Sequence, residues 1–195
     1  MMPGHMFHLM SGSTHVQRFN VATRSWSQGP PLPAPLFEGC SVSTDLGLIV
    51  IGDFEAGEPN GYILTHDDQW KPLPLTHFSH TNPGCTSARI NNSEVVVVVT
   101  GDYVEMLRLA DMRWIVLPRP NIHRSPEVRP TVGFSFGRLL IAGGLDLEHG
   151  DVSDVIEEWD DELADWTITA ARVDNPTIRH SDVSISLHLM DYCDI

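Results

Sequence analysis

Three groups of side chains in this 195-residue sequence have types and spacings suited to chemistry. The first group is basic and lies in one short stretch, with the members Arg119, His123, Arg124 and Arg129. An arginine offers a planar fork of donors that binds a carboxylate through two hydrogen bonds at once. The group therefore predicts a docking site for an acidic peptide or protein. The alternative is that these arginines neutralise acidic side chains of the chain itself.

The second group is His77 and His80, an H-x-x-H pair followed by Cys85. Histidine and cysteine are the ligands that zinc prefers, so three of them at short spacing are a candidate metal site. Serine, threonine, asparagine and proline surround the two histidines, however, and this composition is typical of a solvated loop. We therefore predict no metal and no cofactor here.

The third group is the acidic run from Asp146 to Asp165, in which paired carboxylates suggest calcium binding or acid and base catalysis. Calcium loops need a tight ligand spacing with a glycine at the bend, and this run lacks it. A solvated sheet edge is the better interpretation, and no catalytic residue is predicted. The motif Asn91-Asn92-Ser93 is formally a glycosylation acceptor, but we expect a turn between two strands there.

The elements that position these groups are indicated by a repeat. Trp26, Trp70 and Trp114 are separated by two identical intervals of 44 residues, and Trp166 follows after 52. A period of about 40 to 50 residues is typical of propeller blades. An indole at such a repeated position is expected to pack between neighbouring copies of the repeated unit.

Other features recur in a fixed order around the tryptophans. Apolar runs that end in glycine precede the last three, at Gly52, at Gly101 and at the pair Gly143-Gly144. Proline clusters follow the first three, at 30–33, 72–74 and 117–120. This order resembles the kelch repeat, with Gly52-Asp53 and Gly101-Asp102 replacing the usual glycine pair. The resemblance implies an all-β chain, a β-propeller of about four kelch-like blades in one domain, 1–195.

We expect blade units at 39–74, 84–118 and 131–169, each with four strands. Segment 6–28 has the pattern of the last three strands of a blade, and 180–189 alternates polar and apolar residues as a first strand does. Two alternatives follow. Either both termini complete one blade and close a ring of four, or the chain is a slice of a larger propeller.

The three cysteines bear on the compartment. Cys40 and Cys85 are 45 residues apart in matching contexts, and Cys193 lies near the end. An odd count with repeat-equivalent placement favours reduced, buried thiols over a disulfide. No secretory or membrane segment is visible, so we expect a cytoplasmic or nuclear protein.

Composition and family resemblance together suggest a function class. The net charge of −14 argues against binding to nucleic acid or to anionic membranes. Kelch resemblance implies protein interaction, often as a ubiquitin ligase adaptor or an actin-associated scaffold, with any BTB or F-box segment outside these residues. In kelch-type adaptors, arginines of blade-entry loops contact the ligand, and Arg124 resembles that placement. The prediction is a non-enzymatic binding module with a protein or peptide partner.

The alternative is a kelch-type propeller enzyme, either similar to copper oxidases or sugar-modifying. A copper site of that kind needs histidine and tyrosine ligands and a cysteine crosslinked to tyrosine. Only three tyrosines are present, and the neighbouring pair Tyr192-Cys193 lies at the chain end.

Overall fold

The computed structural model of the chain describes residues 5–54, 59–90 and 92–174. All the regular structure in these ranges is β, which confirms the predicted all-β class. The strands form four antiparallel sheets, one of three strands and three of four. No helix in the described ranges is long and apolar enough to cross a membrane. The predicted first strand at 180–189 lies outside the described residues.

Each sheet is a meander in which strands that follow one another in the sequence are paired. Sheet 1 contains β1 (His5–Leu9), β2 (Val16–Asn20) and β3 (Ser25–Gln28). Sheet 2 contains β4 (Leu36–Thr44), β5 (Gly47–Phe54), β6 (Gly61–Thr65) and β7 (Trp70–Pro72). Sheet 3 contains β8 (Gly84–Ile90), β9 (Ser93–Thr100), β10 (Tyr103–Arg108) and β11 (Arg113–Leu117). Sheet 4 contains β12 (Thr131–Ser135), β13 (Arg138–Ala142), β14 (Val155–Asp160) and β15 (Asp165–Arg172).

Strand β9 explains why the sheets stack. Successive side chains of a strand point to opposite faces, so an unbroken apolar run needs cover on both faces. Val96 and Val98 pack toward sheet 2, whereas Val95, Val97 and Val99 pack toward sheet 4, and all five are buried. A strand of β-branched residues with two buried faces holds sheet 3 between its neighbours.

Three apolar cores correspond to the three junctions between consecutive sheets. The core between sheets 1 and 2 includes Val16, Leu36 and Val50. The core between sheets 2 and 3 includes Ile49, Ile51 and Leu107, and that between sheets 3 and 4 includes Leu139, Ile141 and Trp166. Burial of apolar area stabilises by about 25 cal/mol per Å², so these junctions are the main source of stability.

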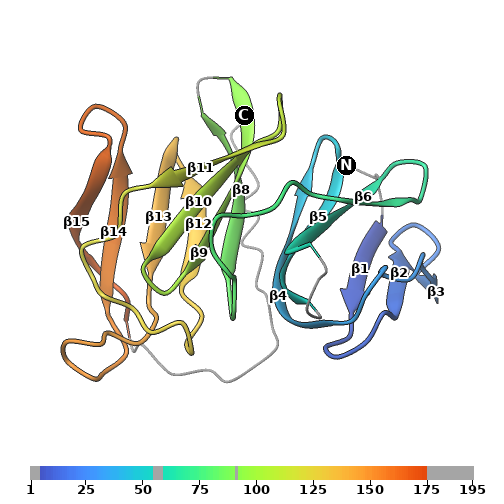
Figure 1. Ribbon diagram of the computed structural model, residues 1–195, viewed down its shortest axis with the longest axis horizontal. Helices are drawn as coiled ribbons and strands as arrows, with labels where there is room; N and C mark the ends of the chain where they lie inside the picture. Colours follow the sequence, from blue (N-terminus) through green and yellow to red (C-terminus); the bar gives the residue numbers. More distant parts are fainter. Residues whose placement is uncertain (1–4, 55–58, 91, 175–195) are drawn as a thin grey trace.

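The first strands of sheets 2, 3 and 4, which are β4, β8 and β12, lie beside one another. Their approach is close at Gly84, where an added Cβ atom would lie 2.3 Å from the carbonyl oxygen of Pro130. Figure 1 shows the sheets in chain order along the longest axis, with β3 near one end and β15 at the other.

The repeated tryptophans lock the sheets to the connections that precede them. Each of three indole N–H groups donates to the carbonyl of the proline four residues after the preceding repeated tryptophan, at 2.8 to 2.9 Å. The pairs are Trp70 with Pro30, Trp114 with Pro74, and Trp166 with Pro118. A buried indole N–H needs a partner, and the proline clusters supply its acceptor.

The repeated glycines serve two different purposes. Gly101, Gly143 and Gly144 have φ values of 53°, 68° and 82°, in the left-handed region that glycine adopts without strain. Gly52 instead permits a close approach, because a Cβ there would lie 2.0 Å from the carbonyl oxygen of Glu38. Gly52 and Gly101 align in the repeat, but of these two only Gly101 has a backbone conformation that favours glycine.

Candidate functional site

The structure separates the four basic residues of the predicted docking group. Arg119 and His123 are half exposed, with 54% and 51% of their side chains accessible. Arg124 is buried. Arg129 is directed toward β4, where its Nη2 donates to the carbonyl of Gly39 at 2.9 Å. Of the four, only Arg119 and His123 lie together on the surface.

Asp102 brings these two residues together from the turn between β9 and β10. Its Oδ1 accepts the backbone N–H of Arg124 at 2.8 Å, which ties the turn to the connection 118–130. Its Oδ2 lies 3.0 Å from Nδ1 of His123 and 3.5 Å from Nη1 of Arg119. A largely buried carboxylate thus fixes two donor side chains that remain accessible to solvent.

An aromatic pair adjoins this carboxylate. Tyr103 follows Asp102 in the chain, and its ring stacks on that of Phe78 with centroids 4.3 Å apart and planes at 22°. Tyr103 is exposed and Phe78 is half-buried. We call the five residues Phe78, Asp102, Tyr103, Arg119 and His123 the Asp102 surface. It combines two accessible hydrogen-bonding side chains with accessible aromatic area.

The predicted ligand-contacting role of Arg124 meets a physical obstacle, because its side chain is enclosed. Its Nη1 pairs with Oε2 of Glu157 at 2.5 Å, and both side chains are completely buried. Its Nε donates to the carbonyl of Gly143 at 2.9 Å. The arrangement matches the alternative that the arginine neutralises an acid of the chain itself. A docking ligand cannot reach this guanidinium in the described conformation.

Glu157 takes part in a contact that the sequence motifs did not indicate. In this contact, which we call the carboxylate clamp, a buried glutamate of one sheet accepts backbone N–H groups of the connection that precedes the sheet. Its carboxylate accepts the backbone N–H groups of Asn121 at 2.5 Å and Ile122 at 3.3 Å. In sheet 3, Glu105 likewise accepts the backbone N–H groups of His77 at 2.9 Å and Phe78 at 3.1 Å. Each glutamate stands nine residues before its repeated tryptophan, and that shared spacing was a signal available in the sequence.

His80 takes the place of Arg124 in the clamp of sheet 3. Both residues stand six positions after the proline that binds the indole. The Nε2 of His80 lies 3.0 Å from Oε2 of Glu105, and the Nδ1 of His77 lies 2.7 Å from Oε1. Burial alone would raise the pKa of Glu105, but the hydrogen bonds from His80 and His77 outweigh it and hold the pKa below its ordinary value.

The same contacts account for both histidines of the H-x-x-H pair, His77 and His80. His80 is buried between Glu105 and Thr100, whose hydroxyl lies 3.1 Å from Nδ1. Cys85 is bonded to another cysteine. Within the described ranges no group of three potential ligands is placed to hold a metal ion.

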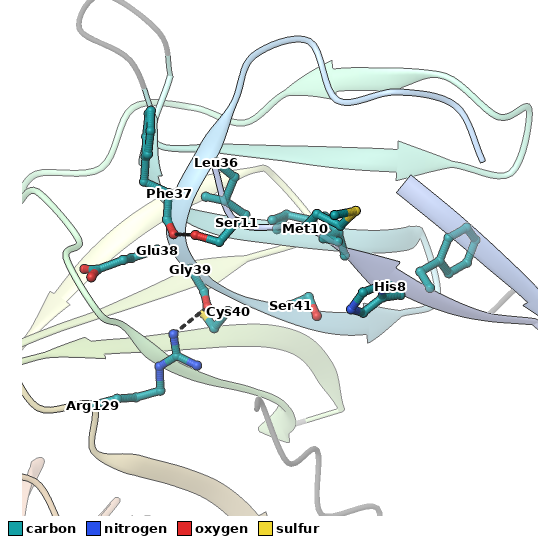
Figure 2. A pocket seen from close by; sticks show the side chains of 13 residues that line it. His8, Met10, Ser11, Leu36, Phe37, Glu38, Gly39, Cys40, Ser41 and Arg129 are labelled. Atoms are coloured by element: carbon teal, nitrogen blue, oxygen red, sulfur yellow. Dashed lines mark hydrogen bonds between the residues drawn. The ribbon is translucent and has the colours of Figure 1, made fainter. Parts of the chain in front are cut away.

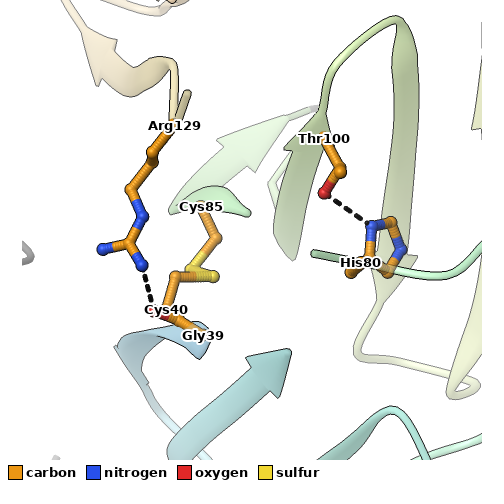
Figure 3. Close-up of a disulfide and its surroundings, with 6 residues drawn as sticks. All are labelled: Gly39, Cys40, His80, Cys85, Thr100 and Arg129. Carbon is orange, nitrogen blue, oxygen red and sulfur yellow. Dashed lines mark hydrogen bonds between the residues drawn. A yellow bond between two sulfur atoms is a disulfide. The ribbon is translucent and has the colours of Figure 1, made fainter. Parts of the chain in front are cut away.

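Cys40 and Cys85 form a disulfide, so the prediction of two reduced thiols is wrong. Figure 3 shows the bond joining β4 to β8, close to Arg129. The Cα atoms are 5.9 Å apart because the first strands of sheets 2 and 3 lie side by side. The matching repeat positions that suggested two independent thiols are what bring them together. The inference from reduced thiols to a reducing compartment therefore loses its basis.

A small cavity of about 140 Å³ lies between β1 and β4. Figure 2 shows backbone and side chains of both strands around it, with Arg129 reaching in from the connection before β12. Its other charged or ionisable lining residues are His8 and Glu38. Arg129 thus belongs to a location distinct from the Asp102 surface.

The acidic run is divided among several local partners. Asp146 accepts from the ring of His149 at 2.8 Å, which raises the pKa of His149, mainly through this hydrogen bond. Glu158 pairs with Arg138 at 2.6 Å. Glu157 points into the interior instead. The run is therefore a set of separate contacts along β14 and its flanking turns.

No protein-family model and no curated protein matches this sequence. Any functional assignment has to rest on the chemistry of the surfaces described above.

Proposed function

We propose that the four sheets are divergent kelch-like propeller blades and that the chain is a protein-binding module. The meander order within each sheet, the adjacent first strands and the repeated indole contacts support this architecture. Sheets 1 and 4 stand at opposite ends of the long axis in Figure 1, which favours a segment of a larger ring over a closed ring of four blades. Such a scaffold presents its loops as a binding face.

The proposed contact site is the Asp102 surface, and its ligand is an acidic segment of a partner protein. The observation that carries the proposal is the accessibility of two donors fixed by one carboxylate. Arg119 has only its long contact with Asp102 among the described residues, so most of its donors face solvent. The Nε2 of His123 has no partner in the described part of the chain. A ligand carboxylate can accept from Arg119, and it can accept from Nε2 of His123 when both ring nitrogens carry a proton.

The aromatic pair adds the apolar part of the site. Residues that contribute most to binding are enriched in tyrosine and arginine, and they act best where water is excluded. The stacked rings of Phe78 and Tyr103 are held in place before a ligand arrives, which lowers the entropy lost on binding. The preferred segment therefore carries an acidic residue next to an aromatic or aliphatic one.

Peptides selected from a displayed random library against the whole chain provide the test. We expect the selected peptides to be enriched in acidic residues beside apolar ones. For the best peptide, Arg119→Ala should weaken binding by about tenfold, as loss of a charged hydrogen-bond pair at an interface does. Arg89→Ala is the matched control, because Arg89 is 59% exposed and paired with Asp45 near the β8–β9 hairpin, at the far end of the strands. Equal affinity of wild type and Arg119→Ala would refute the site.

A further inference from the structure

Sheet 1 has one face that no other described sheet covers. Met6, Phe19 and Trp26 stand opposite one another across β1, β2 and β3, so they lie on the same face. Phe7, Leu9 and Val16 belong to the other face, which packs on sheet 2. Trp26 is 58% exposed and Met6 is 61% exposed, and the rings of Phe19 and Trp26 lie 5.0 Å apart. We call Met6, Phe19 and Trp26 the Trp26 face.

The rest of the chain shows what covers such a face. Each other repeated indole is covered by the preceding sheet and donates to a carbonyl four residues beyond that sheet's own tryptophan. The indole of Trp26 has no acceptor among the described residues, since no sheet precedes it there. A partner that covers the Trp26 face in the same way is a sheet of the same repeated kind. Its acceptor carbonyl lies four residues beyond its own tryptophan.

Sheet 4 carries the matching surface. Leu140 and Ala142 occupy the positions of β13 that Ile49 and Ile51 occupy in β5, counted from each hairpin. Ile49 and Ile51 are completely buried because sheet 3 covers them, whereas Leu140 and Ala142 are only partly buried. Ile156 pairs with Ala142 and shares its face. We call Leu140, Ala142 and Ile156 the Leu140 face.

The repeat also specifies an acceptor at this end. Four residues beyond Trp166 is Ala170, whose carbonyl corresponds to those of Pro30, Pro74 and Pro118. Glu158 stands opposite Leu140 in the ladder, but its charge is compensated by Arg138 at 2.6 Å. The surface can therefore be covered without leaving a carboxylate unpaired.

We propose that the Trp26 face of one chain docks on the Leu140 face of a second copy of the same chain. Within one chain these faces belong to sheets at opposite ends of the long axis, as Figure 1 shows, so a second copy fits where the chain's own sheet 4 does not reach. The contact is head to tail, with the Trp26 indole donating to the carbonyl of Ala170. Two copies that make it reciprocally close a ring of eight sheets, which lies within the range of propellers, about four to eight blades.

The first experiment measures the mass of the whole chain in solution by light scattering over a range of concentrations. The proposal expects a species of twice the 21.7 kDa chain mass. Trp26→Asp should raise the dimer dissociation constant by more than about 100-fold, because each dimer contains this contact twice. Phe136→Ser is the control, since Phe136 is 97% exposed at a hairpin tip outside both faces, and it should remain dimeric.

The second experiment separates interface loss from misfolding. Leu140→Arg alone should also be monomeric, yet an equimolar mixture with Trp26→Asp should form a heterodimer, because one intact pair of faces remains. Circular dichroism spectra matching wild type show that each variant is folded. A wild-type monomer at every concentration, an open series of larger species, or a mixture that stays monomeric would each overturn the proposal. None of these outcomes depends on the Asp102 surface.

Discussion

The two connections 73–83 and 118–130 are held to the following sheet in the same way, but with different partner side chains. Each links two sheets and has backbone N–H groups that face the interior, and each is held by a buried glutamate of the following sheet. Glu105 uses two histidines as further donors, whereas Glu157 uses the single arginine Arg124. These two junctions therefore share a carboxylate clamp, whereas the partner side chain of the carboxylate differs between them. One clamp pairs its carboxylate with imidazole rings, and the other pairs it with a guanidinium group.

The connection before β4 shows that the clamp is optional. At the position of the glutamate, sheet 2 has Gly61, and at the position of the cation it has Leu36, which is buried. A Cβ atom on Gly61 would lie 2.8 Å from the carbonyl oxygen of Val50 and 2.9 Å from Leu73 Cδ1. At this junction, apolar side chains of the core pack against one another in the place that the clamp occupies in sheets 3 and 4.

Removing the carboxylate from the arginine clamp gives the largest expected effect. Glu157→Ala leaves the charge of Arg124 buried without its partner, which costs about 3 to 5 kcal/mol of the free energy of unfolding. Urea denaturation followed by circular dichroism measures this cost. The control is Glu158→Ala, because its partner Arg138 is largely exposed and such pairs contribute about 0 to 1 kcal/mol. Similar losses for both variants would remove the distinction between clamp and surface pair.

Reduction of the disulfide tests what else holds the histidine-clamped junction. The Cys40–Cys85 bond closes a loop with a sequence separation of 45 and joins sheets 2 and 3. Its loss should lower the free energy of unfolding by about 2 to 4 kcal/mol. Urea curves with and without dithiothreitol measure the change, and the double variant Cys40→Ser, Cys85→Ser should be insensitive to the reductant. An insensitive wild type would show that the bond does not form in solution.

The apolar junction is tested by Gly61→Ala. The added methyl group has no space between Val50 and Leu73, so we expect a loss of about 1 to 3 kcal/mol in thermal or urea unfolding. Gly133→Ala is the control, because a Cβ at Gly133 meets nothing within 4 Å. If both substitutions are tolerated equally, close packing does not replace the clamp in sheet 2.

The smallest effect is a change in acid sensitivity at the histidine clamp. The pKa of Glu105 is held below its ordinary value of 4.5, so the carboxylate contributes stability above that pH and loses it as the pH falls through the lowered pKa. His77 and His80 face this carboxylate. Glu105→Gln should reduce the slope of stability against pH below 4.5 by up to about 1.4 kcal/mol per pH unit. An unchanged slope in urea titrations at several acidic pH values would contradict the lowered pKa.

Much of the fold could be predicted because the signals are local and repeated. The valine run of β9 indicates a central strand, and the glycine-ended runs and tryptophans place the strands of each sheet. The disulfide was not predicted because the number of cysteines does not show where the first strands meet. Cys40 and Cys85 stand at matching positions of neighbouring first strands, and lateral contact of those strands brings the two sulfur atoms together.

The candidate site was only partly predictable. A loop arginine is ordinarily exposed, and the burial of Arg124 depends on Glu157, which is 33 residues away and faces inward from β14. Arg119 and His123 come together only because Asp102 lies between them, on a turn of another strand pair. Such contacts follow from the packing of whole sheets, which no short motif encodes.

Hydrogen exchange of the indole N–H groups tests whether the sheets are copies of one unit locked by the repeated tryptophans. Each resonance can be assigned by a single Trp→Phe substitution in an isotope-labelled chain. We expect slow exchange for Trp70, Trp114 and Trp166 alike, because each donates to a proline carbonyl between two sheets. Exchange of any of these three at the rate of a free indole would contradict the repeated lock.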